Sequence, residues 1–87
     1  MKFKDSYFSK AHKYCLGIEE LSQKRYISIP VSNSKIDYQE YYEIDAQEFE
    51  ALMNAPEKAI QLAEKCRRRE NDANLILKPG SERGFPF

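Results

Sequence analysis

The sequence predicts a small α+β domain, in which a β-hairpin and a third short strand are covered on one face by two to three helices. A chain of 87 residues has surface enough to bury only one core. Its hydrophobic fraction of 41% and charged fraction of 32% are typical of a globular domain. Apolar runs with strand periodicity are followed by segments with helix periodicity, and a sheet with helices on one face buries both. We therefore expect one domain over residues 1–87, with a turn-rich and flexible tail over about residues 79–87.

The first segment, "SYFSKAHKYCLGIEE", is predicted to be helical because its apolar residues recur near a helical period. The residues that would share one helix face are Phe8, Ala11, Cys15 and Ile18. Gly17 argues against a helix at its position, since a glycine in a helix interior costs about 1 kcal/mol relative to alanine. The stretch "YCLGIEEL" therefore remains a candidate for extended structure.

The segment "RYISIPVSNSKIDYQEYYEI" predicts a β-hairpin, because two runs rich in β-branched and aromatic residues flank the turn-forming "SNSK". Glu40 falls on the apolar face of the second strand, which predicts either a bulge or a carboxylate at the sheet rim. Pro30 lacks an N–H donor and predicts a sheet edge at its position. The residues expected on the apolar faces are Ile27, Ile29, Val31, Ile36, Tyr38, Tyr42 and Ile44.

Two helices and a strand are predicted after the hairpin. Asp45 is expected to cap the first helix, with Glu48 completing a capping box. Asn54 ends that helix, and Pro56 begins the second. "NLILK" predicts a short final strand. The residues expected to face the core are Phe49, Leu52, Met53, Ile60, Leu62, Ala63 and Cys66.

Acidic residues are concentrated in one part of a chain whose net charge is zero. Residues 36–62 hold seven acidic groups and one basic group, whereas residues 1–35 hold three acidic and seven basic groups. Residues 63–87 hold four acidic and six basic groups. A neutral chain is not expected to be attracted generally to nucleic acid or to membranes. The uneven distribution of charge, however, predicts a local acidic surface.

Enzymatic and metal chemistry find little support in the sequence. His12 is the only histidine, and no Gly-x-Ser-x-Gly elbow accompanies the serines. His12, Cys15 and Cys66 lack the paired spacing of a structural zinc site. The clustered carboxylates come without a glycine-rich phosphate loop or the spacing of a calcium loop. We expect no enzyme activity, no cofactor and no metal.

Cysteine content and the N-terminal residues favour a cytoplasmic protein. Cys15 and Cys66 lie far apart, whereas small secreted domains carry a denser set of disulfides. Both are expected to be reduced and buried, with a single bridge between them as the alternative. The stretch "MKFKDSYFSKAHKYC" lacks the apolar core of a secretory signal, and no run approaches the length of a membrane span.

Two surfaces are candidates for binding a partner. The acidic candidate joins the polar face of the second hairpin strand to the helix after it, and consists of Asp37, Tyr41, Glu43, Glu48 and Glu50. An aromatic anchor within a surface of one charge is typical of protein interfaces, although an ordinary solvated surface explains the pattern equally well. A homodimer contact is a third possibility.

The basic candidate is the run "KCRRRE" at the end of the second helix, with Arg67, Arg68 and Arg69. Arginines neutralise phosphates in nucleic-acid complexes. Successive helical residues point in different directions, however, and cations near a helix C-terminus also favour the helix dipole. Pairing with Glu64 and Glu70 is the alternative explanation of this cluster.

The run "SIPVSNSKIDYQEYYEID", the helix ending in "CRRRE" and the segment "LKPGSERG" together resemble small bacterial immunity proteins of polymorphic and contact-dependent toxin systems. The resemblance covers about the last two thirds of the chain. It implies a cytoplasmic, non-enzymatic protein that binds a cognate toxin domain, often a nuclease, and does not itself bind nucleic acid. Such proteins often place carboxylates where substrate phosphates would lie. The neutral net charge departs from this pattern, which leaves the basic helix end as the alternative docking surface.

Overall fold

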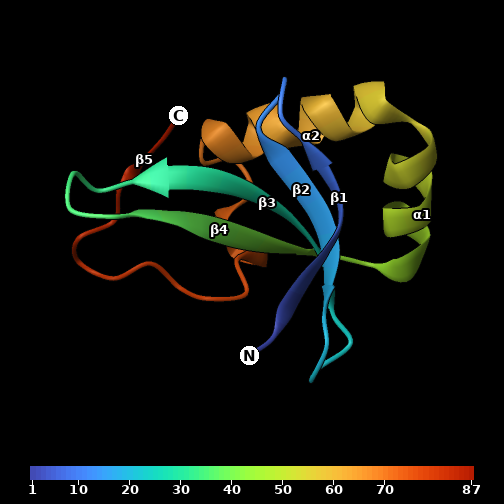
Figure 1. Cartoon of the computed structure of the whole chain (residues 1–87), viewed down its shortest axis with the longest axis horizontal. Helices are drawn as coiled ribbons and strands as arrows, with labels where there is room; N and C mark the ends of the chain where they lie inside the picture. Colours follow the sequence, from blue (N-terminus) through green and yellow to red (C-terminus); the bar gives the residue numbers. More distant parts are fainter.

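Four strands form one antiparallel sheet in the order β1–β2–β3–β4 in the computed structural model, which describes all 87 residues (Figure 1). The strands are β1 (Phe3–Ser9), β2 (Tyr14–Glu19), β3 (Arg25–Ser32) and β4 (Asp37–Ile44). A two-residue strand, β5 (Phe85–Pro86), pairs with the end of β3. The helices are α1 (Ala46–Asn54), α2 (Pro56–Arg67) and a single 3-10 turn, η1 (Asp72–Asn74). The predicted α+β class is confirmed.

The helix predicted for the first segment is wrong, because that segment forms the β1–β2 hairpin. The alternative, extended structure within "YCLGIEEL", is confirmed by β2. Phe8 lies opposite Cys15 in the antiparallel register. Lys13 ends the connecting turn in a left-handed conformation with a φ of 53°. The turn interrupts the strand alternation of apolar residues. The combined spacing of apolar residues from the two strands therefore resembles that of a helix. Gly17 is required by a close approach, since a Cβ there would lie 2.4 Å from both the Lys4 carbonyl oxygen and the Tyr26 hydroxyl.

The β3–β4 hairpin is confirmed, and its register runs without a shift from Arg25 opposite Ile44 to Ser32 opposite Asp37. Of the two alternatives expected for Glu40, a bulge or a carboxylate at the sheet rim, the bulge is therefore wrong. Its side chain is buried on the helix side of the sheet, where a cation from the C-terminal segment reaches it. β2 pairs with β3 only as far as Ser28, whereas β4 continues beside β3. Pro30 therefore lies where β2 no longer pairs with β3.

Both predicted helices and their boundary at Asn54 are confirmed. The Asp45 carboxylate accepts a hydrogen bond from the Glu48 amide over 2.7 Å, as expected of an N-cap residue. Met53 differs from the prediction because 39% of it remains exposed, and Ala59 faces the core instead. Neither helix has the length and apolar composition that crossing a membrane requires.

The two faces of the sheet are built differently. We call the side covered by α1 and α2 the helix face and the opposite side the open face. Aliphatic side chains and two tyrosines of the strands pack beneath the helices in a single cluster, whose members are Tyr14, Leu16, Ile27, Ile29, Val31, Tyr42, Ile44, Phe49, Leu52, Ala59, Ala63, Cys66 and Leu75. Because side chains alternate along a strand, the neighbours of these residues point to the open face. That face carries Phe3, Asp5, Cys15, Gly17, Tyr26, Ser28 and Tyr41.

The predicted "NLILK" strand is wrong, since only Leu75 forms an isolated bridge, opposite Tyr42. The Ile76 amide donates to the Tyr41 carbonyl over 2.9 Å, and the chain then leaves β4. It passes alongside β4 as a loop and returns to the sheet at β5, beside the end of β3 (Figure 1). The C-terminal segment thus lies against two strands that are distant from it in sequence.

Candidate functional site

The open-face side chains of β4 were predicted to form an acidic surface around an aromatic anchor. Asp37 and Glu43 are both exposed, at opposite ends of β4. They lie six positions apart along an extended strand, which corresponds to about 20 Å. Glu43 has one cation nearby, with 3.8 Å between its carboxylate and the Lys24 ammonium, and both side chains are largely exposed. An exposed pair of this kind contributes little stability, so Glu43 remains available to another partner.

Tyr41 is half-buried between these two carboxylates, and its ring is held by other aromatic rings. It stacks on Phe3 with centroids 3.6 Å apart and meets Tyr26 edge-on at 4.9 Å. Burial raises the pKa of the Tyr41 hydroxyl, and the nearby Asp5 carboxylate raises it further. Tyr41 therefore presents a neutral hydroxyl on a fixed ring, because Phe3 covers one side of it.

The ring cluster is anchored by a hydrogen bond of 2.6 Å, which the Tyr26 hydroxyl donates to the Asp5 carboxylate. Burial raises the pKa of Tyr26, and this bond to an anion raises it further. Phe3 belongs to β1 and Tyr41 to β4, the two outer strands of the sheet. The sheet thus curls over its open face until its outer strands meet at this end.

The two acidic residues predicted on the first helix, Glu48 and Glu50, are exposed on α1 and form no ion pair. Glu48 lines a groove between α1 and α2 that also contains Lys58 and Lys65. The structure therefore separates the predicted acidic set into two parts. Asp37 and Glu43 belong to the open face of the sheet, and Glu48 belongs to the helical layer.

The predicted basic cluster is engaged in contacts within the chain. Arg67 pairs with Glu64 over 3.0 Å, and its other terminal nitrogen donates to the carbonyls of His12, over 2.8 Å, and Lys13. These bonds attach the end of α2 to the turn between β1 and β2. The expected pairing with Glu64 is confirmed.

Arg68 and Arg69 have separate partners, because the chain leaves α2 after Arg67 and Arg69 adopts a left-handed conformation with a φ of 62°. Arg68 pairs with Glu70 over 3.0 Å, and this hydrogen bond lowers the pKa of the Glu70 carboxyl. Arg69 donates to the Gly84 carbonyl over 2.7 Å, and its guanidinium lies 5.1 Å from the centroid of the Phe85 ring. The three guanidinium groups therefore do not converge on one surface.

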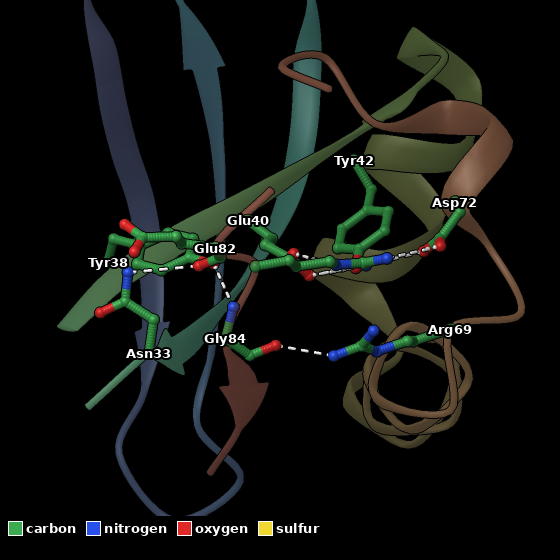
Figure 2. A network of polar contacts seen from close by, with 9 residues as sticks. Asn33, Tyr38, Glu40, Tyr42, Arg69, Asp72, Glu82 and Gly84 are labelled. Atoms are coloured by element: carbon green, nitrogen blue, oxygen red, sulfur yellow. Dashed lines mark hydrogen bonds and ion pairs between the residues drawn. The ribbon is translucent and has the colours of Figure 1, made fainter. Parts of the chain in front are cut away.

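A polar network around buried Glu40 on the helix face was not predicted from the sequence. The one indication of it was the acidic side chain of Glu40 at an apolar position of the strand. The Arg83 guanidinium binds Glu40 through two nitrogens, at 2.7 and 3.2 Å, and Asp72 through two nitrogens, at 2.7 and 2.9 Å. The Tyr42 hydroxyl donates to the same Glu40 carboxylate over 2.8 Å. Figure 2 shows the carboxylates of Glu40 and Asp72 lying on opposite sides of the group that joins them.

The network shifts the pKa values of Asp72, Arg83 and Tyr42. Hydrogen bonds from Arg83 lower the pKa of Asp72, and the two carboxylates raise the pKa of Arg83 itself. Burial raises the pKa of Tyr42, and donation to Glu40 raises it further. Asp72 and Arg83 thus stay charged and Tyr42 stays neutral near neutral pH. The arrangement fixes the C-terminal segment to β4.

The same segment is held by further polar contacts, which Figure 2 also shows. The Gly84 amide donates to the Tyr38 hydroxyl over 2.7 Å, and Asn33 donates to the Glu82 carbonyl over 3.3 Å. Gly84 is required there, since a Cβ would lie 2.2 Å from the Ser32 carbonyl oxygen.

The side chains considered for metal chemistry lie apart from one another. His12 is exposed in the β1–β2 turn, Cys15 is buried on the open face, and Cys66 is buried in the helix-face core. Both cysteines are free, and burial raises the pKa of each thiol to about 11. No group of three or more histidine, cysteine, aspartate or glutamate side chains is arranged to hold a metal ion.

Comparison of this chain with protein-family models, with curated proteins and with solved structures finds no match.

Proposed function

We propose that this domain is a cytoplasmic, non-enzymatic immunity protein that binds and neutralises a cognate toxin domain. The toxin that we propose is a nuclease. One observation carries the proposal. The carboxylates of Asp37, Glu48 and Glu50 have no ion-pair partner within the chain, whereas Arg67 and Arg69 bind backbone carbonyls and the charge of Arg68 is balanced by Glu70 in an exposed pair. The exposed charge that remains for a partner on these two candidate surfaces is therefore negative. The resemblance of the sequence to immunity proteins supports the same class of partner.

The docking surface in this proposal is the open-face side of β4. Asp37 and Glu43 offer carboxylates about 20 Å apart on a rigid strand, a separation that fits a basic cleft better than a single cation. Tyr41 lies between them, and its ring is held in place by stacking on Phe3, so little side-chain freedom is lost when a partner covers it. Glu48 and Glu50 add negative potential from α1, which speeds the approach of a basic partner.

Binding to nucleic acid through the arginine cluster is the competing function. A phosphate-binding surface needs guanidiniums that are free to neutralise phosphates. Arg67 and Arg69 instead hold the β1–β2 turn and the C-terminal segment, which leaves only Arg68, in an exposed pair with Glu70, to bind a phosphate. These contacts weigh against the competing function.

The first test is a pull-down of the tagged protein from the lysate of its own cells at moderate salt, with mass spectrometry for proteins and staining for nucleic acid. We expect a stoichiometric basic protein whose toxic activity the domain suppresses. Bound nucleic acid without a protein partner would contradict the proposal.

Charge reversal then locates the surface. We expect Asp37→Lys/Glu43→Lys to weaken capture of the partner by at least about tenfold, because charge pairs across an interface become repulsive. Glu20→Lys/Glu57→Lys is the matched control, since both residues are exposed, form no ion pair, and change the net charge equally. Equal loss in both variants would assign the effect to net charge and remove β4 as the docking surface.

A further inference from the structure

A cleft of about 300 Å³ lies at the end of the open face away from the stack of Phe3 on Tyr41. The rings of Phe8 and Phe87 border it, and 61% and 48% of these residues are exposed. Buried Cys15 and half-buried Pro30 lie at its base. The curled sheet is closed by aromatic contacts at one end and is open at the other.

The cleft has an apolar interior and a basic rim. Lys10 and Lys13 line it, and none of its lining residues has an acidic side chain. The Cys15 thiol stays neutral near physiological pH, because burial raises its pKa to about 11. An occupant with an apolar body and a negative charge would therefore complement both parts.

The position of the rim is fixed by contacts from elsewhere in the fold. Arg67 binds the carbonyls of His12 and Lys13, which holds the turn that presents the lysines. The Lys13 ammonium lies 5.5 Å from the centroid of the Phe87 ring, and the Phe87 amide donates to the Pro30 carbonyl over 3.4 Å. Little reorganisation is needed before binding, which favours affinity in a small site.

We propose that this cleft binds an aromatic side chain that adjoins a carboxylate on a protein partner. The aromatic ring enters between Phe8 and Phe87, and the carboxylate meets Lys10 and Lys13. A cleft of this volume lies at the small end of ligand sites and suits one large side chain. This site goes beyond the proposed function, since it lies apart from the predicted acidic residues. It selects a negatively charged group on the partner, whereas the acidic surface selects a positively charged one.

The test uses three short peptides and the intact protein labelled with ¹⁵N, observed by NMR. The probes are acetyl-Glu-Phe-amide, acetyl-Lys-Phe-amide and acetyl-Glu-Ala-amide at millimolar concentration. We expect the Glu-Phe peptide to shift the amide signals of Phe8, Lys13 and Gln39, which surround the cleft. The other two peptides should bind roughly three- to tenfold more weakly, as expected for the loss of exposed charge pairs or of the ring.

Two variants and one control complete the experiment. Lys10→Glu/Lys13→Glu should reverse the preference to the Lys-Phe peptide, and Phe8→Ala should reduce binding of both aromatic peptides. Lys2→Glu/Lys4→Glu makes the same change in net charge near the other end of β1 and should leave binding unchanged.

Three outcomes would overturn the assignment. Equal binding of the glutamate and lysine peptides would remove the charge selection, and absence of shifts at the cleft would remove the site. Cleft signals that move on dilution of the protein alone would assign the surface to a second copy of the chain. None of these measurements involves the toxin, so failure here is distinct from failure of the proposed function.

Discussion

The two faces of the sheet each bury one carboxylate, and the two carboxylates are neutralised by different means. Glu40, on the helix face, is 7% exposed and binds the Arg83 guanidinium and the Tyr42 hydroxyl. Glu19, on the open face, is fully buried and has no cation. It accepts hydrogen bonds from the backbone amides of Lys2, Leu21 and Ser22, at 2.6, 3.1 and 2.8 Å.

The difference shows how each face depends on the rest of the chain. Glu19 draws two of its three donors from the turn that directly follows it, so this carboxylate is stabilised mainly by local backbone geometry. Glu40 draws its cation from 43 residues away, so the helix face depends on docking of the C-terminal segment. Removal of a donor should therefore affect the two faces to different extents.

The largest effect is expected for Arg83→Met, which leaves Glu40 buried without a cation. Breaking a buried pair from one side destabilises a protein by about 3–5 kcal/mol. Urea denaturation should show this loss as a lower transition midpoint at neutral pH. The double variant Arg83→Met/Glu40→Gln should recover much of it, because the amide carries no charge to neutralise. A double variant no more stable than Arg83→Met would mean that Glu40 is already solvated.

The next effect is expected at acidic pH and concerns Glu19. Hydrogen bonds from Ser22 and from the Lys2 and Leu21 amides lower its pKa from 4.5 to about 2. Because the pKa is lower in the folded state, its stabilisation is complete above pH 4.5 and is lost as the pH falls towards 2. Urea titrations of Glu19→Gln should fall less steeply over this range than those of the parent protein. Glu20→Gln is the control, and an equal change in both variants would exclude Glu19 as the cause.

The smallest effect is expected for Gly17→Ala, which acts on the open face alone. The added Cβ would lie 2.4 Å from the Lys4 carbonyl oxygen, and forced contacts of this kind cost about 1–3 kcal/mol. Gly80→Ala is a matched control, because nothing lies within 4 Å of a Cβ there. We expect the control to change the free energy of unfolding by roughly 0.5 kcal/mol or less. Equal stability of the two variants would show that β1 moves freely away from Tyr26.

Local patterns predicted the parts of the fold in which neighbouring residues decide the structure. Alternation of apolar residues identified the β3–β4 hairpin, and Asp45 and Pro56 marked the helix starts. The β1–β2 hairpin was missed because its turn contains no glycine, and Lys13 adopts the left-handed conformation instead. Gly17 was considered only as a helix breaker, whereas its role is to let Tyr26 pass close to β1.

The candidate site was predictable in residue type but not in arrangement. The sequence places six carboxylates between Asp37 and Glu50, but whether a carboxylate is free depends on residues distant in sequence. Glu40 is paired with Arg83, whereas Asp37 has no partner. The misfit of Glu40 on an apolar face was the signal that a distant cation was needed.

The long separation between Glu40 and Arg83 has a consequence for synthesis of the protein. Glu40 leaves the ribosome 43 residues before the guanidinium that neutralises it. A nascent chain that already contains all four long strands and both helices still lacks this cation, and burying the acid alone costs several kcal/mol. We therefore expect the helix face to close late, so that stalled or truncated chains lacking residue 83 remain open to proteases and are cleared.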